Sequence, residues 1–302
     1  MYQRNAQTYY PVTEEGNPLV TPASYLTFFR LKEYPWSLSA DPRYFWRSHY
    51  AETILTRLRR GIDLRMGCLL LTGEPGTGKT TLIRALAADL AADNVAHQFA
   101  WLGPSQGLTP RLVWAGVAGA LGIDPLPRTR AELVSQVQRE LQRLANQGGG
   151  FTAVVDEAQL LPGATLQELK LLTNLESAHK LVGVILTGQS SLAIRLRHPS
   201  LKGVASRVAI AVQQQPLRTE EVGSYLRHRL QVAGLAEMPF TREAVDAIAR
   251  AARCNPRRIN ILADLAMAEA ANRRERTITP EAARHAVAVQ QAELQAAAAR
   301  QE

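Results

Sequence analysis

Several features that define whole classes of protein are scarce in this sequence of 302 residues. Its two cysteines, Cys68 and Cys254, are too few for a disulfide framework, and neither has metal-ligand spacing around it. No apolar run approaches the ~20 residues of a membrane-spanning helix, and the strongest, 68–71 and 181–186, have the length of strands. The N-terminus is polar and lacks the apolar region of a secretory signal. We therefore expect a cytoplasmic globular protein with reduced thiols and no direct membrane span.

Lysine is also scarce: the chain has five lysines and 30 arginines, and its formal net charge is +8. The six histidines show no ligand spacing, so we expect no zinc site. An arginine surplus suits contact with nucleic acid, because the guanidinium group binds phosphate oxygens in a bidentate manner. A GC-rich genome with solvated surface charges explains the same surplus, since the arginines are spread along the chain. Both interpretations stay open, and double-stranded DNA is the partner expected under the first.

The order of apolar runs divides the chain into four parts. Twelve of the 18 aromatic residues lie in the first 50 positions, and within that stretch residues 1–24, rich in proline, are expected to form an irregular arm. Apolar strands alternate with amphipathic helices over residues 25–214, which predicts an α/β domain with a parallel sheet flanked by helices. Residues 215–290 have helical periodicity only and predict a smaller helical domain, followed by a helical or frayed tail at 291–302.

The most specific motif follows the strand expected at 67–73. Residues 73–80 fit G-x-x-x-x-G-K-[ST], in which a curled backbone directs consecutive N–H groups at a chain of phosphates. Lys79 then reaches the β- and γ-phosphates of ATP, and the Thr80 hydroxyl is a ligand of Mg²⁺. An ordinary glycine-rich turn is the alternative, but the buried strand before the motif and the helix expected at 79–92 favour a phosphate loop. The predicted nucleotide-binding residues are Gly73, Glu74, Pro75, Gly76, Thr77, Gly78, Lys79, Thr80 and Thr81.

An acidic pair ends the apolar strand expected at 151–155. Asp156 and Glu157 match a Walker B motif, in which Asp156 helps to hold the metal and Glu157 polarises the attacking water. Two acids at a helix N-terminus are the structural alternative, and the phosphate loop upstream makes it the weaker one. Two neighbouring carboxylates with separate roles indicate hydrolysis rather than storage of the nucleotide.

Polar residues downstream are candidates for the γ-phosphate. Thr187 and Gln189 follow the strand expected at 181–187, where either side chain would lie beside the acidic pair; a plain turn is the alternative. Arg207 precedes the last strand and is our choice for an arginine supplied by a neighbouring subunit, although Arg195, Arg197 and Lys202 lie close by in the sequence. Arg257 begins a helix of the second domain and is a candidate to reach the nucleotide from there.

Together these motifs resemble an AAA+ ATPase of the ExeA-like branch (general secretion pathway protein A), which groups with transposition ATPases such as TnsC, TniB and MuB. The resemblance implies that Gln189 is sensor 1, Arg207 the arginine finger and Arg257 sensor 2, and that Tyr44 and Phe45 lie near the adenine. The branch usually has glycine where this chain has Cys254. The segments that carry the resemblance are 28–33, 35–45, 70–81, 156–161, 171–176, 186–189 and 255–260.

These inferences leave three hypotheses about function. The first is an oligomeric, DNA-associated ATPase, in a ring or a filament, that regulates a mobile element together with a transposase. It is favoured by the basic surplus and by the lack of the membrane and cell-wall modules expected of the full secretion protein. The second is a cytoplasmic ATPase of a secretion or envelope-assembly system with a protein partner. The third is an ATP-gated switch with little turnover, which Glu157 and the candidate arginine finger argue against.

Overall fold

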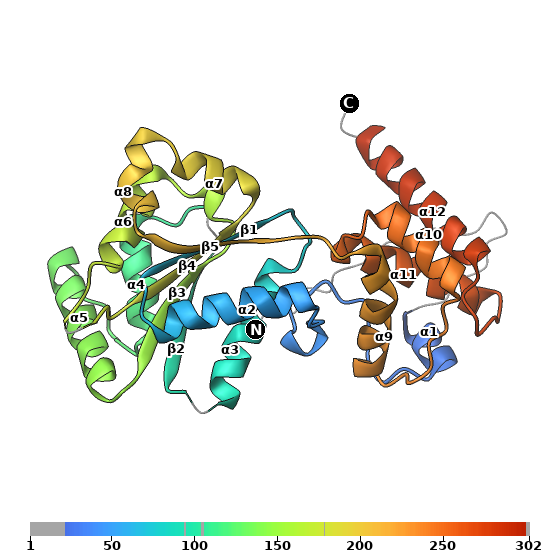
Figure 1. Ribbon diagram of the computed structural model, residues 1–302, viewed down its shortest axis with the longest axis horizontal. Helices are drawn as coiled ribbons and strands as arrows, with labels where there is room; N and C mark the ends of the chain where they lie inside the picture. Colours follow the sequence, from blue (N-terminus) through green and yellow to red (C-terminus); the bar gives the residue numbers. More distant parts are fainter. Residues whose placement is uncertain (1–21, 94, 104–105, 178, 300–302) are drawn as a thin grey trace. The chain divides into compact units, whose positions relative to one another are not determined.

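The computed structural model describes residues 22–93, 95–103, 106–177 and 179–299 (Figure 1). The chain divides into two compact units, Ala40–Pro216 and Met1–Ser39 with Leu217–Glu302. We call the first the sheet unit and the second the helical unit. Most of the arm expected at 1–24 lies outside the described residues, and its last three positions begin helix α1 (Pro22–Phe29).

The described residues of the sheet unit form five parallel strands in the order β2-β3-β4-β1-β5. The expected parallel α/β sheet is therefore confirmed. Because all five strands run the same way, the segments that follow them emerge at one edge of the sheet. The strands are β1 (Cys68–Gly73), β2 (His97–Leu102), β3 (Gly150–Val155), β4 (Gly183–Gly188) and β5 (Val208–Gln214).

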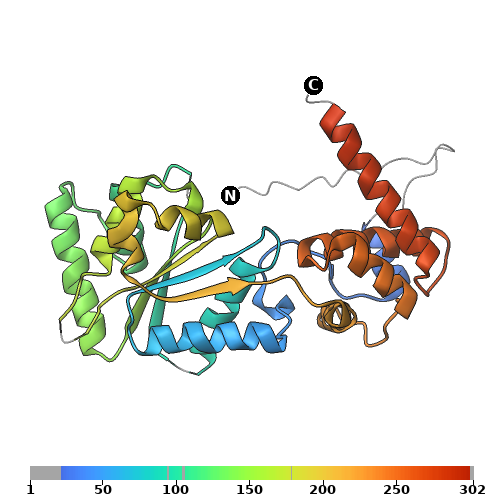
Figure 2. The ribbon, with the colours of Figure 1, turned by 45° about the horizontal axis from the view of Figure 1, so that its top comes forward.

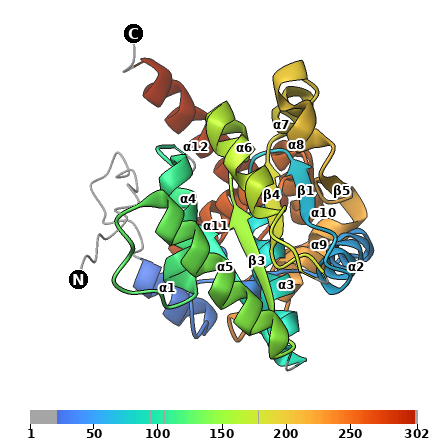
Figure 3. The ribbon, with the colours of Figure 1, turned by 90° about the vertical axis from the view of Figure 1, so that its left-hand side faces the viewer.

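Helices cover both faces of this sheet because its central strands are apolar on both sides, as in other parallel sheets. On one face, α2 and α3 pack their leucines and isoleucines against β1, β3, β4 and β5. On the other face, α4 to α8 enclose a second apolar cluster. Figure 2 shows α2, in blue, running beside β5, and Figure 3 shows the sheet between α2 and the pair α4 and α5. The helices are η1 (Pro42–Tyr44), α2 (His49–Asp63), α3 (Lys79–Ala92), α4 (Pro110–Ala120), α5 (Arg130–Asn146), η2 (Ala158–Leu160), α6 (Gly163–Leu172), α7 (Ser190–Leu196), η3 (Pro199–Leu201) and α8 (Lys202–Ala205).

As far as it is described, the helical unit contains α1 and four longer helices. Residues 25–39 pack here, although the sequence placed them with the sheet. The Tyr25 hydroxyl donates to Asp264 Oδ1 over 3.1 Å, and burial raises the pKa of that carboxyl group. Trp36 Nε1 lies 3.2 Å from Met267 Sδ, so both aromatic side chains are anchored on α11. The remaining elements are η4 (Thr219–Glu221), α9 (Val222–Val232), α10 (Arg242–Ala252), α11 (Pro256–Asn272) and α12 (Pro280–Ala299).

The C-terminal helix extends beyond the part that packs. Its buried residues are Ala282, Ala283 and Ala286, whereas residues 291–299 are all exposed. The tail expected at 291–302 is thus helical as far as it is described. None of the helices in the described ranges is long and apolar enough to cross a membrane.

Candidate functional site

The phosphate loop predicted from the sequence joins β1 to α3 at the carboxyl edge of the sheet. Gly76 and Gly78 have φ of +82° and +93°, a left-handed conformation that bends the loop back on itself and that glycine adopts without strain. The Thr77 hydroxyl donates to Glu74 O over 2.8 Å and closes the turn. No side chain caps the first turn of α3, whose N–H groups therefore suit an anion.

Lys79 lies inside the curl of this loop. Its side chain is 5% exposed, and Nζ donates to Gly73 O and Glu74 O over 3.0 Å each. Burial lowers the pKa of Lys79, while the carboxylates of Asp156 and Glu157 oppose that shift. The ammonium group is thus held by backbone oxygens of the segment that would wrap the phosphates.

Asp156 directly follows β3 and joins three elements of the sheet unit. The Thr80 hydroxyl, in the first turn of α3, donates to Asp156 Oδ2, and the Thr187 hydroxyl, near the end of β4, donates to Asp156 Oδ1. Mg²⁺ prefers oxygen ligands and keeps several waters and substrate phosphates beside one or two protein groups. The touching Thr80 hydroxyl and Asp156 carboxylate are a donor pair of this kind, so both residues predicted as metal ligands fit one ion.

Glu157 has an unusual backbone for its residue type. Its φ of +49° and ψ of +39° are left-handed, which costs a residue with a side chain roughly 1–2 kcal/mol. The Glu157 N–H donates to Asp156 Oδ1 over 2.9 Å, and the side-chain amide of Gln159 donates to Glu157 Oε2 over 2.6 Å. The Glu157 carboxylate is thus held by Gln159, while the Glu157 backbone is held by Asp156.

The two sensor candidates have different surroundings. Thr187 is buried, and its strand β4 lies between the phosphate-loop strand β1 and the acidic strand β3. This placement brings its hydroxyl into contact with Asp156. Gln189 precedes α7, and its backbone N–H donates to Gln159 Oε1 over 3.1 Å. Contact between the Gln189 side chain and a γ-phosphate stays a prediction. Sequence reasoning did not identify Gln159 as a site residue. The one feature that could have indicated it is a polar residue two positions after Glu157.

Arg207 lies far from the phosphate loop of its own chain. It is exposed and directly precedes β5, whose first residue, Val208, pairs with Cys68 at the start of β1. The loop begins at Gly73, five residues further along β1, which is about 16 Å at 3.3 Å per residue. Arg195, by contrast, donates from Nη1 to Gln159 O over 2.8 Å, next to the acidic pair. Among these arginines, Arg207 lies at the edge of the sheet where the strands begin, and its role as an arginine finger stays a prediction.

The remaining predicted residues lie in other surroundings. Arg257 is exposed in the first turn of α11, where the Asn255 side chain accepts its N–H over 3.1 Å. Cys254 has a φ of +55°, in the left-handed region that favours glycine, which is the residue that the resemblance leads us to expect at this position. Tyr44 is buried in η1, and Phe45 packs partly buried against the cluster of α2 and α3. The roles of Arg257, Tyr44 and Phe45 stay predictions.

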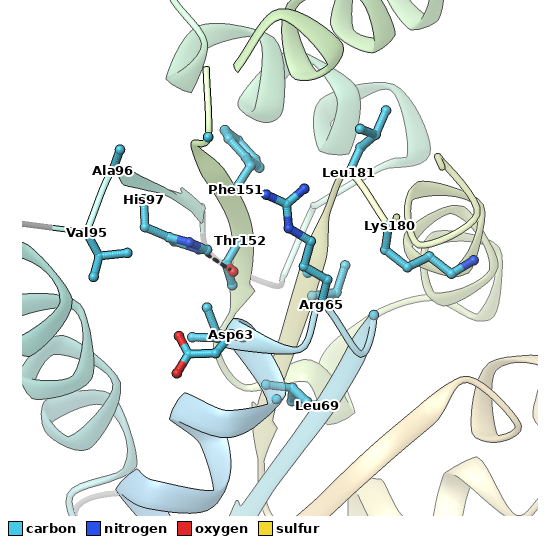
Figure 4. Close-up of a pocket in the computed structure, with 17 residues that line it drawn as sticks. Asp63, Arg65, Leu69, Val95, Ala96, His97, Phe151, Thr152, Lys180 and Leu181 are labelled. Atoms are coloured by element: carbon cyan, nitrogen blue, oxygen red, sulfur yellow. Dashed lines mark hydrogen bonds between the residues drawn. The ribbon is translucent and has the colours of Figure 1, made fainter. Parts of the chain in front are cut away.

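A separate cavity of about 190 Å³ lies at the opposite edge of the sheet, where β2, β3 and β4 begin (Figure 4). His97 and Thr152 face each other there, with His97 Nε2 at 2.8 Å from the Thr152 hydroxyl. The pKa of His97 is lowered to about 4, chiefly by burial; Asp63 opposes this shift, and Arg65 and Arg59 add to it. His97 is therefore neutral at pH 7 in the folded protein.

This neutral histidine makes stability depend on pH. An unfolded histidine binds a proton below about pH 6.5, whereas folded His97 does not until about pH 4. The free energy of unfolding should therefore fall by about 1–2 kcal/mol as pH drops from 7 to 4.5. This figure is smaller than the pKa difference alone would give, because solvent screens the charge of the half-buried His97. Denaturant unfolding of wild type and His97→Gln at both pH values measures this contribution, since the glutamine amide can either donate to the Thr152 hydroxyl or accept from it. Equal losses in the two proteins would contradict it.

Comparison with known proteins gives a consistent result. Residues 63–196 match the family model of an AAA domain. Over 247 residues the chain is 38% identical to general secretion pathway protein A of Aeromonas hydrophila, covering 80% of this chain and 44% of that protein. The chain therefore spans less than half the length of this relative.

Solved structures share the fold at low sequence identity. Cdc6p of Pyrobaculum aerophilum is 22% identical with a TM-score of 0.65, over 83% of this chain and 69% of that one. A chain of Drosophila ORC bound to DNA is 21% identical with a TM-score of 0.68, over 98% and 72% of the two chains. These likenesses support the arrangement of a parallel sheet and a helical region.

Proposed function

The chain belongs to the AAA+ family of P-loop ATPases, and from this we propose that it binds ATP with Mg²⁺ and hydrolyses it as part of a homo-oligomer. The observation that carries the proposal is the contact of Thr80 with Asp156, made beside a phosphate loop whose lysine is already in place. A hydroxyl and a carboxylate that meet there are the two protein ligands that a nucleotide-bound Mg²⁺ requires.

In this proposal each residue of the site has a separate role in ATP hydrolysis. The loop N–H groups and Lys79 bind the phosphates and reduce repulsion between their charges. Thr80 and Asp156 would hold Mg²⁺, which when bound would supply positive charge against the negative charge that develops on the phosphates. Glu157 accepts a proton from the attacking water, and Thr187 holds Asp156 in the orientation that its metal role needs. Gln189 contacts the γ-phosphate from the turn after β4.

The active site is completed by a second subunit in this proposal. Arg207 lies too far from its own phosphate loop, so it would neutralise charge on the γ-phosphate bound by a neighbouring copy. Arg257 would approach the nucleotide from the helical unit.

Arg207→Ala should lower ATP turnover by about 10²–10³-fold, because an arginine finger in trans contributes that much or more. Mixing this variant with Glu157→Gln should restore part of the activity, since one mixed interface then combines an intact Glu157 with an intact Arg207. Turnover against mixing ratio measures the rescue, and Arg139→Ala on α5 serves as a control of equal charge change. Rescue at no ratio would contradict a shared site.

We propose double-stranded DNA as the partner and regulation of a mobile element as the process, in the cytoplasm. The arginine surplus supports this, and one structurally similar protein is ORC bound to DNA. The second candidate is a secretion or envelope-assembly system acting on a protein partner, which the similarity to general secretion pathway protein A favours. A transposase is the expected partner under the first proposal, a secretion component under the second.

Salt dependence separates these two proposals. If about six phosphates are contacted, DNA affinity should fall on the order of 10³-fold between 50 and 200 mM salt, because each contact releases condensed counterions. Fluorescence anisotropy of labelled duplex with ATP present, over a salt series, measures the slope. Heparin as a competitor controls for binding to any polyanion. No detectable binding at 50 mM salt would favour the secretion system.

A further inference from the structure

Gln159 occupies a place between the catalytic carboxylate and the turn after β4. Its side-chain amide donates to Glu157 Oε2 over 2.6 Å, and its Oε1 accepts the Gln189 N–H over 3.1 Å. Its backbone carbonyl accepts Arg195 Nη1 over 2.8 Å, which ties η2 to α7. All three contacts lie within the sheet unit, and one side chain links two residues that the proposed mechanism assigns to different tasks.

The space around Gly188 shows how closely the Gln159 side chain packs against this turn. A Cβ atom at position 188 would lie 2.5 Å from Gln159 Oε1, nearer than non-bonded atoms approach each other. The next contacts of that Cβ would be Leu192 Cδ2 at 3.0 Å, which can move, and Ala158 N at 3.5 Å. Glycine at position 188 thus leaves room for the carbonyl oxygen of Gln159 and little else.

We propose that Gln159 is a positioning residue that fixes the Glu157 carboxylate and links its position to the turn that carries Gln189. The proposal rests on the role of Glu157 as the base in ATP hydrolysis. Among the residues that the structure describes, Gln159 makes the one hydrogen bond to the Glu157 carboxylate, since the other hydrogen bond of Glu157 is made by its backbone N–H. A carboxylate free to rotate spends less time in the geometry that proton transfer needs.

The same contacts make the link two-way. Because Gln159 Oε1 binds the backbone of Gln189 and not its side chain, a shift of the turn moves Gln159 whichever group Gln189 contacts. Gln159 therefore transmits the position of the β4–α7 turn to the carboxylate that activates water.

Gln159→Ala tests the positioning role through the separation of kcat from KM. We expect kcat for ATP to fall by about 10–100-fold with KM changed less than about twofold, because orientation is lost while the phosphate loop is intact. Gln138→Ala, at an exposed position of α5, is the matched control and should hydrolyse ATP as wild type does. Circular dichroism and thermal unfolding establish that each variant is folded.

Gly188→Ala tests the link itself in a double-mutant cycle. In the wild-type background the added methyl group pushes on Gln159 Oε1, so kcat should fall by about 10-fold, as an orientation effect. In the Gln159→Ala background the atom it meets is gone, so Gly188→Ala should change kcat by less than about twofold. Equal effects in both backgrounds would overturn the link.

The outcomes also separate this inference from the proposed function. If Glu157→Gln turns over ATP normally, the proposed base is wrong and the role of Gln159 is overturned with it. If Glu157→Gln is inactive but Gln159→Ala keeps wild-type kcat or exceeds it, the base is right and the positioning role is wrong. If Gln159→Ala raises KM at unchanged kcat, Gln159 contributes to binding and the positioning role is again wrong.

Discussion

Replacing Lys79 with alanine is expected to weaken ATP binding by about 10³–10⁴-fold, because two unit charges about 4 Å apart attract by roughly 4 kcal/mol at an effective dielectric constant of about 20, and Lys79 would face two phosphates of the proposed nucleotide. The ammonium group is buried at the centre of the loop, where water cannot replace it well. Its two backbone acceptors, Gly73 O and Glu74 O, would also lose their donor. Titration with a fluorescent ATP analogue and Mg²⁺ measures the dissociation constant.

Lys180→Ala is the matched control for this experiment. Lys180 pairs with Glu176 and lies just before β4, at the edge of the sheet where the strands begin. The same charge is removed there, away from the phosphate loop, so nucleotide affinity should stay within about twofold of wild type, as for surface charges in general. Nucleotide binding by Lys79→Ala at wild-type affinity would show that residues 73–80 are not a phosphate site.

Glu157→Gln is expected to keep ATP affinity and lower turnover by about 10³–10⁴-fold, the upper range for loss of a general base. Glutamine keeps the size of the side chain and an oxygen that can accept from Gln159, but it cannot take a proton. Because Thr80 and Asp156 stay intact, ATP should remain bound and the oligomer should remain assembled. Single-turnover hydrolysis, nucleotide titration and size-exclusion chromatography with ATP measure the three properties.

Two comparison variants show whether the effect belongs to this carboxylate. Glu140→Gln, on α5 beside Arg143, makes the same chemical change at the surface and should leave turnover unchanged. Asp156→Asn removes the charge that faces Thr80 and should weaken the Mg²⁺ dependence of binding, a defect that Glu157→Gln does not share. Ordinary turnover by Glu157→Gln would exclude it as the base.

The chemistry of the site was predictable because each motif is local. The glycines at 73, 76 and 78, with Lys79 and Thr80, specify a phosphate loop through backbone conformation and charge alone. The apolar strand before Asp156 and Glu157 specifies that both carboxylates emerge where a parallel strand ends. The alternation of such strands with amphipathic helices was enough to predict a parallel sheet, since the hydrophobic periodicity of a helix or strand depends on residues close together in the sequence.

Arrangement in space depends on contacts between distant residues, which local pattern does not encode. Only the folded chain places β4 between β1 and β3, so that Thr187 and Thr80 meet Asp156 from two sides. Only the packing of Tyr25 and Trp36 on α11 assigns residues 25–39 to the helical unit.

The sequence by itself determined that this protein has a phosphate loop, an acidic pair and a parallel sheet, because short segments carry that information. The tertiary structure decided which side chains touch: Gln159 with Glu157 and with the turn of Gln189, and Arg207 at the edge away from its own loop. The reason is physical, since strand order and the register of neighbouring strands result from long-range packing of the whole sheet.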